Sequence, residues 1–283
     1  MESAVKVSRL RQAAAVAGAR IIGFGAYQPS TVVTSEETAK RFGRTGEWVQ
    51  GRTGIVSLRK ASAAETVHEM AIAAGRQALA NSGVDASRIG LVIVASCSAE
   101  KPMPDVASEV AQRIGARTAG AFDLNAACAG FCYALTVAAD VVRNGSAEYV
   151  LVVGTERMTA WVDPADLGTS IIFGDGAGAA VVGPSAEPGI GPVVWGSDGQ
   201  GADLIRIPDF TRGMHMEGRQ HVGRVDSPCS ATACRGQSGR AGLARAADRL
   251  RRGPELRRAG GHLALTWGNV SRTSVSKVRL SNR

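Results

Sequence analysis

Cysteine, aromatic residues and long apolar runs are all scarce in this sequence. Five cysteines in 283 residues, a small and odd number, argue against a disulfide framework and for a reducing compartment, so we expect a cytoplasmic protein. No apolar run is long enough to span a membrane, and the apolar stretch near the N-terminus is weak for a signal peptide. Aromatic residues make up only 5% of the chain, whereas 35 glycines suit tight turns around an Ala/Val/Ile core.

The basic excess of the chain lies entirely in its last fifth. Of the 33 Lys and Arg residues 13 fall in residues 221–283, against only 3 of the 25 Asp and Glu residues. The overall charge of +8 therefore combines +10 in this tail with −2 in the remaining 220 residues. The tail is rich in Arg, Gly, Ala and Ser and lacks the interleaved aromatics of a nucleic-acid groove. We expect no nucleic-acid partner and no membrane contact.

From residue 19 the chain alternates between strand and helix patterns. Strand patterns, β-branched or continuously apolar, cover the segments 19–29, 89–98, 120–127, 148–156, 169–183 and 190–199. Helix patterns, with apolar residues three and four positions apart, cover 36–43, 66–83, 105–116 and 130–145. Alternation of this kind predicts a layered α/β fold around a central mixed sheet.

Three parts are expected along the chain. Residues 1–18 are an N-terminal extension, and residues 19–184 form one α/β unit. Residues 185–283 form a second, incomplete unit, whose aberrant basic tail begins at about residue 221. In that tail the strand and helix periodicity ends, and one short helix over 243–256 is the only element predicted.

The stretch "LNAACAGFCYAL", residues 124–135, contains two cysteines four residues apart. Cys128 follows a predicted strand and opens a predicted helix, and its small neighbours suit a sharp turn between the two. A thiol at a helix N-terminus meets the positive end of the helix dipole and free backbone amides, which favour the thiolate. Cys128 is therefore a candidate nucleophile, and Cys132, one turn deeper, is predicted to lie in the core.

A metal site and a buried packing role are the alternatives for the two cysteines. No second pair of Cys or His follows at ligand spacing, and Cys229 and Cys234 lie far away in the tail, so we expect no metal site. By composition alone, a buried, alanine-like cysteine is the default for Cys128. Its sequence context favours the nucleophile instead.

That context resembles the thiolase-like condensing enzymes and, within them, β-ketoacyl-[acyl-carrier-protein] synthase III. The motifs are "IIGFGAYQP", "EWVQGRTGI", "AFDLNAACAGFCYAL", "VLVVGTE", "DPADLGTSIIFGDGAGAAVVG" and "GSDGQGADLIRIP", which together span residues 19–220. The resemblance implies a layered αβαβα fold of two duplicated halves, here with the second half incomplete, and a homodimer. It also implies that Cys128 accepts an acyl group from acyl-CoA, with acyl carrier protein as partner and no cofactor beyond the substrates.

Further site residues follow from the same resemblance. Trp48 and Arg52 match positions that line the CoA and pantetheine tunnel, although a packed Trp near a turn is an equal alternative on physical grounds alone. Met103 matches a position that reaches into the partner subunit's acyl pocket. Ala160 stands where the family frequently has a second adenine-contacting Arg. Three glycines are expected to bring the backbone close to the active site: Gly174, Gly176 and Gly178.

The family's second half-reaction decarboxylates malonyl-carrier-protein, and its His and Asn donors lie in "PHQAN"-like and "HGNTS"-like loops. Neither loop is present, and the histidines are His68, which we expect at the surface or as a helix cap, His215, His221 and His262. "ALTWGNV" resembles the family's closing strand, and the alternative that Asn269 in "GNVS" is the amide is weaker. The abrupt change after "MHMEGRQ" fits a reading-frame disruption.

The resulting expectation is a synthase III-type acyltransferase of fatty-acid or polyketide synthesis, whose full condensation is in doubt. Two alternatives stay open. One is a non-catalytic remnant or dimer subunit, and the other is an acyltransferase of the same fold that does not decarboxylate malonyl groups.

Overall fold

The computed structural model describes residues 15–197 and 199–202, together with the backbone of five short strands farther along the chain. These strands form one pair and one three-stranded sheet. The pair is β8 (Ile205–Arg206) with β9 (Glu217–Gly218), and the sheet is β10 (Arg257–Ala259), β11 (His262–Ala264) and β12 (Arg279–Ser281). The helix predicted over 243–256 lies outside the described residues.

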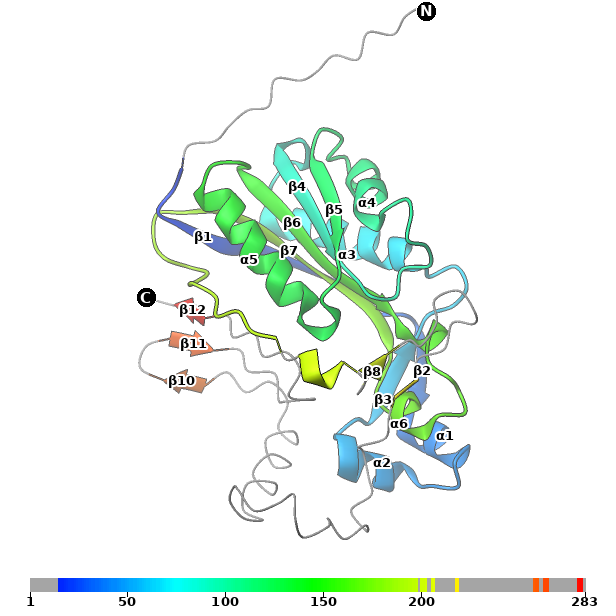
Figure 1. Cartoon of the computed structure of the whole chain (residues 1–283). Coiled ribbons are helices and arrows are strands. Elements are labelled where there is room, and N and C mark those ends of the chain that lie inside the picture. Colours follow the sequence, from blue (N-terminus) through cyan, green and yellow to red (C-terminus); the bar gives the residue numbers. More distant parts are fainter. Residues whose placement is uncertain are drawn as a thin grey trace, which may run out of the picture.

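The largest sheet has five strands (Figure 1). In space they follow the order β1 (Gly18–Tyr27), β7 (Asp175–Ser185), β6 (Tyr149–Arg157), β4 (Ile89–Ala95) and β5 (Gly120–Leu124). β7 is antiparallel to both β1 and β6, whereas β6, β4 and β5 run parallel to one another. The mixed sheet predicted from the sequence is therefore confirmed.

Helices cover both faces of this sheet. They are α3 (Val67–Ser82) and α4 (Val106–Ile114) on one face and α5 (Gly130–Arg143) on the other. Side chains of β4 alternate between the faces, because Val92 and Val94 pack with α3 and α4, whereas Ile93 and Ala95 pack with α5. Burial on both faces explains why this strand is a continuous apolar run in the sequence.

The ends of α3 follow from its sequence. Thr66 caps the N-terminus by accepting a hydrogen bond from the amide of Glu69, and Gly83 ends the helix in the left-handed conformation (φ 68°). The helix predicted over residues 66–83 is thus confirmed, with Thr66 and Gly83 as its caps. Asp105 and Gly115 delimit α4 in the same way.

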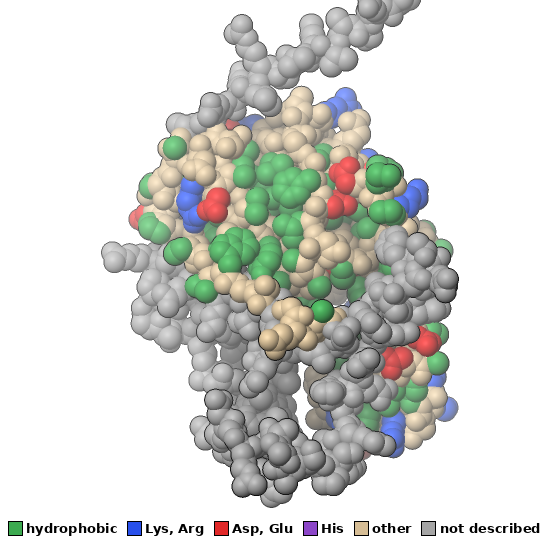
Figure 2. All heavy atoms as spheres, viewed as in Figure 1, with side chains coloured by type: hydrophobic (Ala, Val, Ile, Leu, Met, Phe, Trp, Pro, Cys, Tyr) green, Lys and Arg blue, Asp and Glu red, His purple; other side chains and the backbone are tan. Residues whose placement is uncertain are grey.

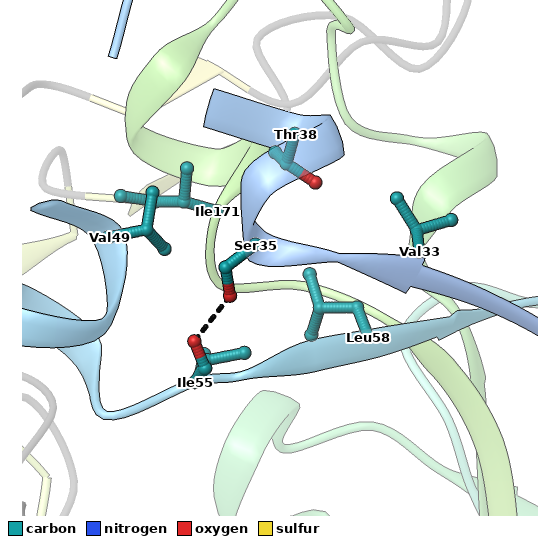
Figure 3. Close-up of a pocket in the computed structure, with 7 residues that line it drawn as sticks. All are labelled: Val33, Ser35, Thr38, Val49, Ile55, Leu58 and Ile171. Carbon is teal, nitrogen blue, oxygen red and sulfur yellow. Dashed lines mark hydrogen bonds between the residues drawn. The ribbon is translucent and has the colours of Figure 1, made fainter. Parts of the chain in front are cut away.

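A smaller layer of short elements lies beside the sheet. It contains a hairpin of β2 (Thr31–Thr34) and β3 (Ser57–Lys60), with α1 (Ser35–Lys40), α2 (Gly46–Thr53) and α6 (Leu167–Ser170). Its apolar interior is lined by Val33, Val49, Leu58 and Ile171, and the Ser35 hydroxyl donates to the Ile55 carbonyl at 2.5 Å (Figure 3). Of these elements the sequence predicted only α1.

Two strand predictions differ from the structure, one at its start and the other along its whole length. The strand expected over 169–183 begins only at Asp175, because the Asp166 side chain accepts from the amides of Gly168 and Thr169 and starts α6. The described residues of the segment 190–199 form no strand. Pro192 lacks an amide donor there, and the segment meets β1 where the Ile190 amide donates to the Ala19 carbonyl at 2.7 Å.

Four turns of 3-10 helix complete the description: η1 (Ala86–Arg88), η2 (Ala127–Ala129), η3 (Met158–Ala160) and η4 (Gly199–Gly201). In the view of Figure 1, where α5 lies in front of the sheet, apolar side chains gather on the surface around α5 (Figure 2). Trp195 packs edge-on against Tyr133 of α5, with ring centroids 4.7 Å apart, so the segment after β7 runs along this helix. No helix among the described residues is long and apolar enough to cross a membrane.

Candidate active site

Cys128 lies in η2, the turn between β5 and α5. Ala127 precedes it with a φ of 46°, a left-handed conformation that costs energy for any residue with a side chain. Such strain persists where the surrounding structure enforces it, and here it turns the chain sharply from strand to helix. The Cys128 side chain is exposed. The sequence placed this cysteine at the opening of the helix, but α5 begins two residues later, at Gly130.

The N-terminus of α5 carries no side-chain cap. Ala129 occupies the cap position and has no side-chain oxygen that could accept from the first amides. Gly130 packs tightly at this point, because a Cβ there would lie 3.2 Å from the Cβ of Ala95. Gly130 therefore allows the close approach of α5 to the end of β4, which a larger residue would push apart.

Cys97 lies in the loop that follows β4. Its amide donates to a carboxylate oxygen of Glu156 at 2.9 Å, and its sulfur lies 3.9 Å from that of Met158. Burial, followed by the negative charge of Glu156, raises the pKa of Cys97 to about 12, and Cys128 adds to this effect. Cys97 therefore lies within electrostatic reach of Cys128 but stays protonated at neutral pH.

Cys132 is half-buried on the first turn of α5, and burial raises the pKa of its thiol. The core prediction is therefore only partly right. The buried stripe of α5 runs through Leu135, Ala138 and Val142, and Cys132 lies on the flank of that stripe.

These environments predict the order in which the cysteines react. At pH 8 we expect iodoacetamide to label Cys128 first and Cys97 about a thousandfold more slowly than an ordinary thiol, because only the thiolate reacts. Peptide mapping over a time course measures the order, with the Cys128→Ser variant as control. Modification of Cys97 or Cys132 ahead of Cys128 would contradict the assignment.

Glu156 accepts hydrogen bonds from the loop that follows β4 and contains Cys97. Besides the Cys97 amide it accepts from the hydroxyls of Ser96, at 3.4 Å, and Ser98. Ser98 in turn accepts from the Arg157 amide at 2.8 Å, and its carbonyl accepts from the indole of Trp161 at 3.0 Å. The sequence interpretation missed this network. Polar residues at the carboxyl ends of two adjacent parallel strands were the signal available.

A second carboxylate was also missed. Asp175, at the start of β7, is buried and accepts from the amides of Ala61 (2.7 Å) and Thr159 (2.9 Å) and from the Thr159 hydroxyl (2.6 Å). Of the glycines around it, Gly174 and Gly176 lie tightly against backbone, since a Cβ would approach the carbonyl oxygens of Arg59 and Tyr27 to 3.1 and 3.2 Å. A Cβ at Gly178 would meet nothing within 4 Å.

The structure brings Trp48 and Arg52 together on α2. The Arg52 guanidinium lies 4.4 Å from the centre of the Trp48 ring. Trp48 is half-buried and packs against the small core of Ala39, Val49 and Ile171, so it is both a packing residue and partly accessible.

Met103 is 79% exposed in the loop between β4 and α4, and its role at a subunit contact stays a prediction. His68 differs from the expectation of a surface or capping residue. Its side chain is only 18% exposed because it packs between Glu100 and Glu109, whose carboxylates lie 3.6 and 3.7 Å from its ring nitrogens. In the first turn of α3 it is Glu100, and not His68, that accepts a hydrogen bond from the Val67 amide.

Several sequence predictions lie outside the described residues: His215, His221, Cys229, Cys234 and Asn269. The backbone of His262 belongs to β11, paired with Ala259 and Ser281. Among the residues that the structure describes, no group of three or more His, Cys, Asp and Glu could hold a metal ion.

Comparison with known proteins matches the region around Cys128 to the family model described as 3-Oxoacyl-[acyl-carrier-protein (ACP)] synthase III, over residues 122–199. A β-ketoacyl-[acyl-carrier-protein] synthase III of Streptomyces coelicolor is 46% identical over 200 residues, which are 71% of this chain and 58% of the relative. The crystal structure of the priming β-ketosynthase from the R1128 polyketide pathway is similar, with a TM-score of 0.67 and 47% identity over 70% of this chain and 59% of that one.

The chain thus spans about six tenths of the length of these relatives. The thiolase-like α/β fold expected from the sequence is confirmed by the structural match. Of residues 185–283 the structure describes 185–197 and 199–202, together with the backbone of five short strands. A longer match is found with the β-ketoacyl-[acyl-carrier-protein] synthase III of Mycobacteroides abscessus, which is 42% identical over 239 residues, or 83% of this chain and 70% of the relative. The chain belongs to the β-ketoacyl-[acyl-carrier-protein] synthase III family.

Proposed function

We propose that this chain transfers an acyl group from acyl-CoA to Cys128, the first half-reaction of a β-ketoacyl synthase III. The Cys128 sulfur attacks the thioester carbonyl carbon, the carbon–sulfur bond to CoA breaks, and CoA leaves with the proton from the cysteine. The observation that supports this most strongly is the exposed thiol of Cys128 on the strained turn at Ala127, directly before α5.

The surroundings of Cys128 support nucleophilic chemistry. The uncapped amides and the positive dipole end of α5 favour negative charge near the turn, both on the thiolate and on the oxygen of the tetrahedral intermediate. The two other described cysteines are unsuited, because burial raises the pKa of each. Selectivity for Cys128 therefore arises from its exposure and its place in the fold.

Substrate and partners follow from the family. Trp48 and Arg52 would contact the CoA end of the donor, and acyl carrier protein would be the acceptor-side partner. A homodimer with Met103 at the contact and a cytoplasmic location complete the proposal. The exposure of Met103 supports the subunit contact, and the three cysteines within the described residues, all of them free, support the location.

Of the alternatives, an acyltransferase that does not decarboxylate malonyl groups fits this 283-residue chain best. Acyl transfer needs Cys128 and a CoA site, and the residues for both lie in the region that the structure describes. Enolate stabilisation needs two further donors, and the family's "PHQAN"-like and "HGNTS"-like loops are not in the sequence.

Acylation is testable by mass. We expect incubation with acetyl-CoA to add one acetyl group to the chain, located on the peptide that contains Cys128, with release of one CoA thiol. The Cys128→Ser variant should acquire none, and Cys132→Ser should behave like the parent chain. Acetylation that persists in Cys128→Ser, or none in the parent, would refute the proposed function and favour a non-catalytic remnant.

A further inference from the structure

Two guanidinium groups share the Trp48 indole. Arg52 lies 4.4 Å and Arg44 5.3 Å from the centre of its ring. Both arginines are exposed, and within residues 15–197 and 199–202 neither forms an ion pair with a carboxylate. A half-buried aromatic ring with two cations unmatched by an anion suggests that the anion comes from a ligand.

The sequence around Trp48 also carries a positive net charge, which favours an anionic ligand. Between residues 40 and 52 there are four basic residues and one acidic residue, Glu47. Trp48 packs against the core formed by α1 and α2. Its amide donates to the Thr45 hydroxyl at 3.2 Å, and Thr45, the residue that follows Arg44, caps the start of α2. The packed ring therefore provides a rigid platform on which both flexible arginine side chains can rest.

Stacking on the ring also restricts the conformations of the two arginine side chains. A guanidinium that rests on an aromatic face keeps its in-plane N–H donors free, and these match the oxygens of a phosphate in a bidentate manner. The ring reduces the conformational entropy that each side chain would otherwise lose on binding. Two such groups on one ring suit a ligand with more than one phosphate, as in the nucleotide part of CoA.

We propose that Arg44 is a second phosphate-binding residue, which acts with Arg52 on the nucleotide end of acyl-CoA; this rests on the proposed function. Trp48 orients both arginines, and the specificity of the site is for the phosphates of CoA rather than for the acyl chain.

The test compares acyl donors with and without the nucleotide. For Arg44→Ala we expect kcat/KM for Cys128 acylation by acetyl-CoA to fall about tenfold or more, as loss of a charge-assisted hydrogen bond does. Acetylation by S-acetyl-N-acetylcysteamine, which has no phosphate, should be unchanged. Arg41→Ala is the matched control, because Arg41 carries the same charge three residues away and lies over Phe42 rather than Trp48, 5.7 Å from the ring centre.

Equal losses in Arg44→Ala and Arg41→Ala would overturn the assignment, because they would indicate general attraction by positive charge. An equal loss with the phosphate-free donor would overturn it too. Calorimetric titration with CoA separates this inference from the proposed function. CoA binding weakened in Arg44→Ala supports the phosphate site even if Cys128 is never acylated, and no CoA binding by the parent chain refutes it.

Discussion

Condensation of an acetyl group with malonyl-acyl-carrier-protein by this chain is expected to be at least about 10⁴-fold slower than by the full-length Streptomyces coelicolor relative. Removal of a single donor to a developing oxyanion typically costs about 10²–10³ in rate, and here the motifs that carry two donors are missing. Formation of the acyl-enzyme at Cys128 should be affected far less. Measuring the rate of product formation per enzyme for both proteins, together with the rate of Cys128 acylation, checks the expected difference in condensation rate.

His262 provides the control for this prediction. Its backbone lies in the middle strand of the sheet β10–β11–β12, and it is the histidine nearest the C-terminal end of the chain. His262→Ala should leave the residual condensation unchanged. Turnover close to that of the relative, abolished by His262→Ala, would show that this histidine replaces the missing donor and would contradict the prediction.

Replacement of Asp175 by Ala is expected to destabilise the fold by about 3 kcal/mol or more. The carboxylate is buried and accepts two backbone amides and a hydroxyl, and these donors belong to chain segments 98 residues apart, at Ala61 and Thr159. The substitution leaves the buried amide of Ala61 and the partly buried amide of Thr159 without an acceptor, and an unsatisfied buried amide costs about 1–3 kcal/mol. Urea unfolding followed by circular dichroism measures the loss.

Asp85→Ala is the matched control. Asp85 also accepts an amide and a hydroxyl, both from Ser87, but it is exposed, so water can replace its hydrogen bonds. We expect a much smaller loss, and Asp175→Asn should fall between the two because an amide oxygen still accepts. Equal unfolding midpoints for Asp175→Ala and Asp85→Ala would show that the buried carboxylate does not hold the segments together.

The elements with strong periodicity were predictable from the sequence. α3 repeats its apolar residues on one face and carries Thr66 and Gly83 at its ends, and β4 is an uninterrupted apolar run because both of its faces are buried. Short elements without such signals were missed. α2 has no apolar stripe, since Val49 is its one buried large side chain, and it is held in place by the neighbouring α1 and α6.

At the site, small residues and a strand-to-helix change are local features that made Cys128 a candidate nucleophile, and the resemblance to the synthase III family favoured this over a buried cysteine. The roles of Glu156 and Asp175 depend on segments that are distant in the sequence, such as the Cys97 loop and Ala61, so no local pattern reveals them. The contact of Arg44 with Trp48 spans only four residues. It was missed because it becomes meaningful only once residues 46–53 are known to be helical.

The most direct test of the account is a pulse–chase experiment on the 283-residue chain. Radiolabelled acetyl-CoA is added first, the nucleotide is removed, and malonyl-acyl-carrier-protein is then supplied. We predict that the label appears on Cys128 within the pulse and remains there during the chase. Rapid transfer of the label to the carrier protein as a condensed product would contradict the claim that this chain performs acyl transfer without condensation.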